Sequence, residues 1–121
     1  LPLITKPSGK YSDAWVESPG KDQLVLEAAE ASTERYAAGK PLSILDGVPI
    51  GVKDDTAVKG YSNNNGMKHH PGLPYFREKE ESIWPVKMLQ EAGAVVIGKN
   101  CMHELGSGQF LPLFVSAFHD S

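Results

Sequence analysis

The chain has 121 residues, with 12 Lys and Arg, 15 Asp and Glu, and a formal net charge of −3. This length is typical of one domain. Its apolar runs stay far below the roughly 20 residues that a membrane-spanning helix needs, and its Lys and Arg residues form no basic cluster. We therefore expect neither a membrane protein nor a nucleic-acid-binding protein.

The cysteines and histidines limit the metal chemistry that the chain can support. Cys101 is the sole cysteine, which excludes an internal disulfide and a cysteine-based zinc site. The four histidines lack the spacing of metal ligands, so we predict no metal and no other cofactor. The single cysteine and the lack of a signal-like apolar segment suit the cytoplasm, which is our only expectation about location.

The amino-terminal third predicts an irregular arm followed by a helix. Residues 1–21 are rich in Pro and Gly and show neither the helical nor the strand period. From Asp22 onward apolar residues recur at helical spacing, with Asp22 as the expected N-cap and Gly39 as the expected stop. The expected apolar rows are Leu24, Ala28 and Ala31, and beside them Val25, Ala29 and Tyr36.

A short strand and a long loop follow. Residues 45–52 predict a β-strand that runs into Lys53. Since Pro49 cannot donate to a ladder, the strand should begin at Ile50 or lie at an edge there. Residues 55–80 show no clear element, and so long a loop indicates either function or packing against an absent partner.

The next segment predicts a second helix and a second strand. Ser82 is the expected N-cap, Pro85 fits the first helical turn, and Gly93 should end the helix. Residues 94–97 are wholly apolar and mostly β-branched, which is typical of a parallel strand covered on both faces. Strand, helix and strand in this order predict an α/β fold.

Lys53 is the principal candidate for chemistry. It follows the first strand, at the sheet edge where α/β proteins usually bind ligands. A lysine acts as a base only when neutral, which requires burial, and Val48, Ile50 and Val52 could supply it. The alternative is a solvated lysine paired with Asp54 or Asp55, and the residues alone leave both open.

Three stretches of the sequence carry a resemblance to a known family. They are residues 41–55 (PLSILDGVPIGVKDD), 89–99 (LQEAGAVVIGK) and 102–106 (MHELG), with Gly60, Tyr61 and Gly66 between them. Together they closely resemble the amidase signature family, and its fungal members look nearest.

The resemblance implies a large α/β/α enzyme with a mixed sheet that hydrolyses small-molecule amides. In this family a serine nucleophile, a second serine with a cis peptide bond and a lysine form the catalytic relay. Lys53 matches that lysine. Met102 matches a position that lines the acyl pocket in some relatives, although ordinary packing is the alternative for it.

The sequence also departs from the family pattern. Family members continue past this point into a Gly-Gly-Ser-Ser-Gly-Gly-Ser type loop that carries both serines, and the 121 residues contain no such loop. Ser107 lies between two glycines in the wrong block, where turn formation is the simpler explanation. The usual Lys-Thr-Asn is here Lys99-Asn100-Cys101.

We therefore expect an arm (1–21), the amino-terminal part of an amidase-signature domain (22–106) and a divergent tail (107–121). The first hypothesis is an amidase portion that carries Lys53 but neither serine and is inactive alone. The second is a noncatalytic binding or interaction protein derived from a truncated amidase gene. A third is a subunit that receives its serines from a partner. Self-association through exposed apolar surface is expected as well.

Overall fold

The computed structural model describes residue 4 and residues 9–102. Two helices and two strands form its framework: α1 (Asp22–Ala37), β1 (Pro49–Lys53), α2 (Trp84–Glu91) and β2 (Val95–Asn100). Short 3-10 turns lie at Ser12–Ala14 (η1) and Pro74–Phe76 (η2). Within these residues no helix combines the length and the apolar character needed to cross a membrane.

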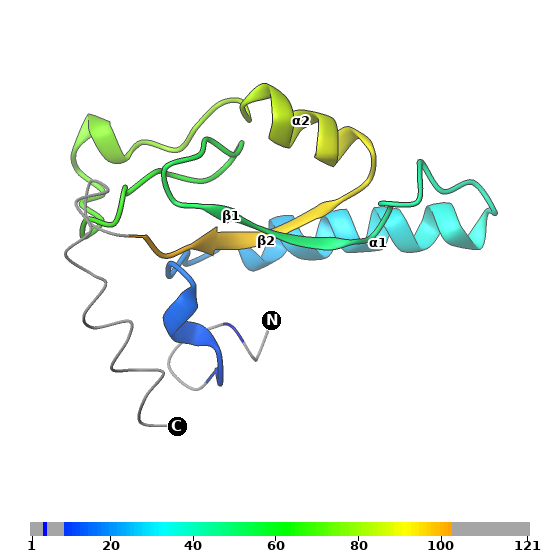
Figure 1. Cartoon of the computed structure of the whole chain (residues 1–121), viewed down its shortest axis with the longest axis horizontal. Coiled ribbons are helices and arrows are strands. Elements are labelled where there is room, and N and C mark those ends of the chain that lie inside the picture. Colours follow the sequence, from blue (N-terminus) through cyan, green and yellow to red (C-terminus); the bar gives the residue numbers. More distant parts are fainter. Residues whose placement is uncertain (1–3, 5–8, 103–121) are drawn as a thin grey trace.

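The centre of the fold is a β-α-β unit. β1 and β2 pair in parallel, and α2 connects them and arches over the strand pair (Figure 1). Parallel strands require such a crossover, so the predicted α/β class is confirmed. β1 begins at Pro49, which is paired with Val95, and the carbonyl of Val48 accepts the Val95 N–H at 2.8 Å. Of the two alternatives that the sequence left open, a start at Ile50 is therefore wrong, and among the described strands β1 lies at an edge.

A bulge interrupts the register of the two strands. Ile50 pairs with Val96, but Gly51 pairs with Gly98, so Ile97 is the extra residue of β2. An uninterrupted register would have set Lys53 opposite Lys99. Because of the bulge, Lys53 lies opposite Asn100 instead, and Val52 lies opposite Lys99.

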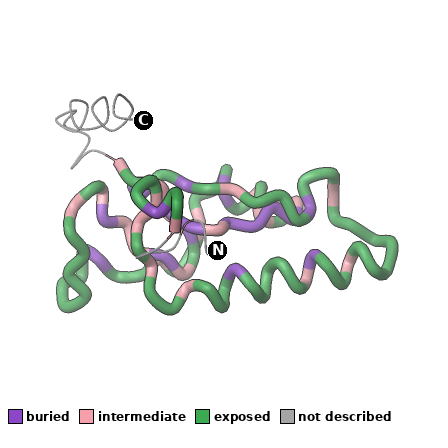
Figure 2. The backbone as a smooth tube through the Cα atoms, turned by 90° about the horizontal axis from the view of Figure 1, so that it is seen from below, coloured by how far each residue is buried: buried purple, intermediate pink, exposed green. Residues whose placement is uncertain are grey.

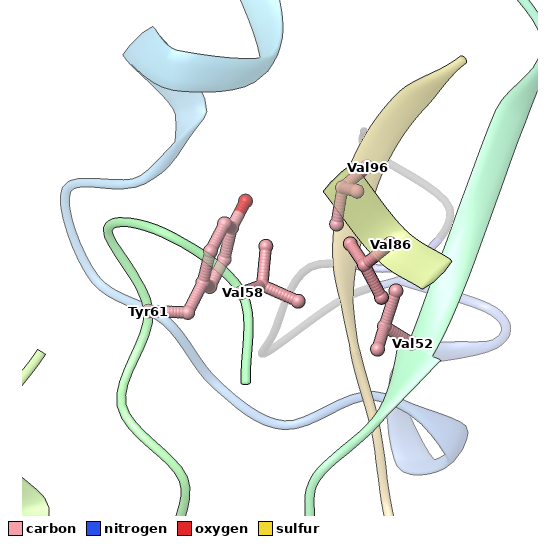
Figure 3. Close-up of a cluster of buried hydrophobic side chains, with 5 residues drawn as sticks. All are labelled: Val52, Val58, Tyr61, Val86 and Val96. Atoms are coloured by element: carbon pink, nitrogen blue, oxygen red, sulfur yellow. The ribbon is translucent and has the colours of Figure 1, made fainter. Parts of the chain in front are cut away.

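The core lies on one face of this sheet. Val52, Val58, Tyr61, Val86 and Val96 form its buried cluster, and Ile50 packs against them. Figure 3 shows Val86 of α2 beside Val52 and Val96, with the ring of Tyr61 next to Val58. The helix α2 is thus held by β-branched side chains that suit a pleated surface.

The ends of α1 match the prediction at one terminus only. The N-cap position is Lys21, with no side-chain capping bond, so the prediction of Asp22 as N-cap is wrong and Asp22 is the first helical residue. At the other end Gly39 has φ +70°, its N–H donates to Tyr36 O, and the Lys40 N–H donates to Arg35 O. This is a Schellman ending, and it confirms Gly39 as the stop.

The predicted apolar rows of α1 are mostly wrong. Val25 and Ser32 are its buried residues, whereas Leu24 and Tyr36 are exposed, and Figure 2 colours most residues of the helix as exposed. The physical reason is that α1 contacts β2 and the loop before β1, partly through polar groups. Little apolar surface covers the rest of the helix in the described part of the chain.

At α2, one of the predicted start signals is wrong. The N-cap position is Ile83, without a side-chain bond. The Ser82 hydroxyl instead donates to Gln90 Oε1 at 2.7 Å and accepts the Lys59 N–H at 3.0 Å, so it ties the preceding loop to the helix. Pro85 in the first turn and the helix end before Gly93 are confirmed.

The arm contributes more than the sequence indicated. Trp15 forms an antiparallel bridge with Asn100, the Val16 N–H donates to Lys99 O at 2.8 Å, and the Cys101 N–H donates to Ala14 O at 3.0 Å. The Trp15 ring lies so close to Gly51 that a Cβ there would come within 2.8 Å of it. The arm therefore packs against the sheet and extends the pairing of β2.

A buried carboxylate fixes the loop that leads into β1. Asp46 is 4% exposed, and Arg35 donates to both of its oxygens at 2.7 Å. Ser32 Oγ and the Leu42 N–H also donate to it, at 2.7 and 2.8 Å. The hydrogen bond from Arg35 holds the pKa of Asp46 well below its usual range, against the opposing effect of burial. These contacts anchor α1 to the strand entrance.

We predict that Asp46 makes the stability of the fold pH-dependent. Its pKa is lower in the folded chain, so its contribution is complete above the unfolded value of about 4 and is lost as pH falls below it. Asp46→Asn should lower Tm by roughly 5 °C or more at pH 7. It should also make the free energy of unfolding fall less steeply as the pH drops below 4. Thermal unfolding at pH 7 measures the change in Tm, and urea unfolding from pH 7 to pH 2 measures how the free energy of unfolding depends on pH.

The matched control is Glu30→Gln, which changes an exposed acid of α1, the helix that binds Asp46, and should keep the wild-type Tm at pH 7. Equal pH slopes for the wild type and Asp46→Asn would contradict the prediction.

Candidate active site

Lys53 lies at the carboxyl end of β1, as the sequence predicts. Its Nζ is 3.3 Å from Asp55 Oδ2, and its side chain is 60% exposed. The expected burial by Val48, Ile50 and Val52 is absent, because Val48 is itself exposed and Val52 points into the core on the opposite face. Among the described residues, Lys53 is thus a solvated lysine paired with an acid.

The face of the sheet that carries Lys53 also carries Gly51 and Asn100. An added Cβ on Gly51 would lie 2.4 Å from Asn100 Oδ1, so this face has room only for glycine at that position. Asn100 stands where the family pattern has threonine, and its carbonyl accepts the Asp54 N–H at 3.1 Å. The departure at Asn100 therefore falls directly beside the candidate lysine.

Asp54 organises the loop that follows β1. The residue is 1% exposed, and its two carboxylate oxygens accept the N–H groups of Asn64 and Gly66 at 3.1 and 3.2 Å. Between these two, Asn65 adopts a positive φ of 49°. Hydrogen bonds from backbone N–H groups compensate a buried carboxylate for its lost hydration. One buried acid thus fixes residues 64–66 beside the end of β1.

Lys99 is the second buried charge at this edge. It is 1% exposed, and its Nζ donates to Thr56 O and to Asn63 Oδ1, both at 2.7 Å. Burial lowers the pKa of Lys99, while the charges of Asp54 and Asp55 act in the opposite direction. Asp54 and Lys99 together hold the loop after β1 from within.

The long loop is more ordered than its sequence suggests. Lys59 forms a parallel bridge with Lys79, and η2 lies within the loop. His69 Nδ1 is 2.9 Å from Asn64 Oδ1, and the His69 and His70 rings both contact Phe76 edge-on. In the described part of the chain, no three His, Cys, Asp or Glu residues are grouped as metal ligands.

The remaining candidates are only partly placed. Met102 follows β2 and is half-buried, and its role in an acyl pocket stays a prediction. Cys101 beside it is exposed. His103, Ser107 and the predicted tail 107–121 lie outside the described residues.

Asp54 and Lys99 are organising groups that the sequence did not predict. Both were visible as charged residues next to apolar β-rich runs, but such residues are usually solvated. The polar loop at residues 62–66 is the part of the sequence that could have indicated them, because its backbone N–H groups and the Asn63 side chain need hydrogen-bond partners when they are buried.

Comparison with known proteins places the chain in a family. The family described as Amidase matches residues 21–110. Fatty acid amide hydrolase of Arabidopsis thaliana is 39% identical over 84 residues, which cover 69% of this chain and 13% of that protein. Fatty acid amide hydrolase of Medicago truncatula is 37% identical over 84 residues, which cover 69% of this chain and 13% of that protein. A glutamyl-tRNA(Gln) amidotransferase component of Synechococcus elongatus is 36% identical over 89 residues, covering 72% of this chain and 17% of that protein.

Solved structures support the same assignment. A crystal structure of an amidase is similar with a TM-score of 0.62 and 32% identity, over 79% of this chain and 20% of that one. Peptide amidase from Stenotrophomonas maltophilia has a TM-score of 0.64 at 24% identity, over 79% of this chain and 18% of that one, and shows the shared fold.

The chain thus spans less than a fifth of the length of these curated relatives. The particular likeness to fungal members and the boundaries at residues 22 and 106 stay predictions. A family match over residues 21–110, relatives near 40% identity and the β-α-β unit lead to one conclusion: the chain belongs to the amidase signature family.

Proposed function

We propose that this chain carries the lysine of an amide-hydrolysing relay, and that Lys53 is that lysine. The observation that carries the proposal is the position of Lys53, at the carboxyl end of β1 and within the sequence block most similar to the family. The side chain is exposed and held only by Asp55 among the described residues, so a serine-bearing segment could reach it. The family pattern supplies that segment, and the 121 residues do not contain it.

In the proposed reaction Lys53 works as a general base. Neutral Lys53 takes a proton from the bridging serine, which takes one from the nucleophilic serine as it attacks the amide carbon. Backbone N–H groups stabilise the oxyanion, and the proton then passes to the leaving amine. The covering segment would also exclude water from Lys53, because a lysine acts as a base only when it is neutral and burial disfavours its charged form.

The substrate class follows from what the relatives share. Their names refer to a fatty acid amide, a peptide amide and the amide transfer of Glu-tRNA(Gln), and the common group is a carboxamide. We propose a small-molecule amide as the substrate. Met102, half-buried beyond β2, is the proposed contact for its acyl part.

A second candidate is a noncatalytic binding or interaction protein derived from an amidase gene. The exposed apolar side chains of the helices, such as Leu24 and Trp84, are the observation that favours it. The transcript separates the two candidates: an open frame that restores the serine loop favours the enzyme, and a stop after Ser121 favours the noncatalytic product. A chain completed by a partner's serines is a third arrangement.

We predict that the purified 121-residue chain hydrolyses neither aliphatic nor aromatic amides above background. The physical reason is that Lys53 has no activated serine to serve. A serine-directed fluorophosphonate should leave the chain unlabelled, as seen by intact-mass spectrometry. Turnover that disappears in Ser107→Ala would contradict the proposal, because it would identify a nucleophile within this chain.

A further inference from the structure

Two lysines occupy the same edge of the sheet in opposite environments. Lys53 at the end of β1 has a side chain that is 60% exposed, whereas Lys99 near the end of β2 is 1% exposed. The bulge at Ile97 makes Lys99 the neighbour of Val52, so its side chain leaves the sheet on the core face. The amidase relay proposed above has no use for this second lysine.

The buried ammonium group binds the segment after β1 through two hydrogen bonds. Lys99 Nζ donates to the carbonyl of Thr56 and to Asn63 Oδ1, each at 2.7 Å. Burying an ammonium group is costly, and an apolar residue of similar size is often as stable in such a place. A lysine here therefore indicates a need for these two contacts in particular.

Thr56 connects Lys99 with Lys53. The Thr56 N–H donates to Lys53 O at 3.0 Å, and the Thr56 hydroxyl donates to Asp55 Oδ1 at 3.1 Å. The other oxygen of Asp55 lies 3.3 Å from Lys53 Nζ. A continuous set of contacts thus runs from Lys99 through Thr56 and Asp55 to the amine of Lys53.

The charged groups around Lys99 come from two segments. Asp54 and Asp55, in the turn after β1, favour its charged form, and Lys79 on the neighbouring loop disfavours it. Asp54 is itself held by the N–H groups of Asn64 and Gly66. The turn after β1 is therefore held by two buried charges of opposite sign, Asp54 and Lys99.

We propose that Lys99 is a positioning residue for Lys53, acting through the carbonyl of Thr56 and the carboxylate of Asp55. The inference rests on the proposed function of Lys53, since it assigns Lys99 the task of orienting that amine. Lys99 does not touch the reacting groups. It determines where Asp55 holds Lys53 when the serine-bearing segment is engaged.

The test is competitive acetylation of the 121-residue chain with acetic anhydride, at submicromolar protein, read out by peptide mass spectrometry. The ratio of Lys53 to Lys87 acetylation reports on the Lys53 amine, because Lys87 is exposed on α2 and outside these contacts. Lys99→Met should raise this ratio about two- to fivefold, which is the range expected for release from an exposed ion pair.

Two further variants complete the design. Lys79→Met removes a charge near Lys99 but no side-chain hydrogen bond to the turn, so it should leave the ratio unchanged. Thr56→Val is nearly isosteric and removes the hydroxyl that holds Asp55, so it should raise the ratio as Lys99→Met does. Circular dichroism verifies that each variant is folded.

An unchanged ratio of Lys53 to Lys87 acetylation in a folded Lys99→Met chain overturns the inference. A fall in Tm would not rescue it, because a purely structural role of Lys99 would lower the stability without changing this ratio. If Lys99→Met does not fold, Thr56→Val decides, and an unchanged ratio there overturns the inference as well. The ratio does not depend on catalysis. Failure of the proposed function, judged by turnover of a Lys53→Ala enzyme, is therefore a separate outcome.

Discussion

Replacing Lys53 by alanine in a chain completed with the family's serine-bearing segment is expected to lower kcat by about 10²- to 10⁴-fold, the usual effect of removing a general base. The fold should persist, because the Lys53 side chain is exposed and its contact with Asp55 is an exposed ion pair. KM should change little, since the relay acts on the proton and not on the bound amide. Steady-state kinetics with a simple amide measures both constants.

The matched control is Lys87→Ala, which removes an exposed lysine from α2 and should leave kcat unchanged. A folded Lys53→Ala enzyme with the kcat of the wild type would remove the lysine from the mechanism. It would also contradict the main inference from the family resemblance, which is that Lys53 is the lysine of the relay.

The sequence was sufficient to predict the elements of the fold where local signals agree. The second strand is apolar and β-branched. Gly39 and Gly93 follow the ends of the two helices, and Pro85 fits a first helical turn. Each of these features follows from local backbone chemistry. The parallel pairing of β1 and β2 follows from the helix between them. These features depend on neighbours in sequence, and this is why the sequence predicted them.

The features that the sequence could not predict depend on distant contacts. The burial of Ser32 on α1 follows from Asp46, 14 residues away, and the pairing of Trp15 with Asn100 joins opposite ends of the described chain. The side of the sheet on which Lys99 lies depends on a bulge at Ile97, inside a run that looks regular. Apolar periodicity carries no information about such partners.

The position of Lys53 was predictable, but its surroundings were not. A strand end followed by charged residues indicates a sheet edge, yet the ion pair with Asp55 and the buried Lys99 depend on how residues 54–66 fold back. Asp54 and Asp55 are the same residue type at adjacent positions, and one is buried while the other is exposed. Their difference is a consequence of loop contacts, since the N–H groups of Asn64 and Gly66 bind Asp54, and only the structure shows these contacts.

The free 121-residue chain is expected to self-associate. Ile44 is 94% exposed and Trp84 is 71% exposed. Leu24 lines a groove of about 550 Å³ that lies between α1, the segment at Gly60 and Tyr61, and residues 93–96. Apolar surface of this kind, together with a two-stranded sheet, favours association or a partly molten state in water.

Sedimentation velocity across a concentration series tests this expectation. Leu24→Glu places a charge in the groove and should weaken association by about tenfold in Kd, or about 1.4 kcal/mol. Leu73→Glu is the matched control, because Leu73 is similarly exposed but does not line the groove. A monomer with slow amide exchange at Val95 and Val96 and no binding of an apolar dye would contradict the expectation. A self-sufficient monomer would favour the noncatalytic product over the enzyme portion, because burial of these strands would then need no further segment.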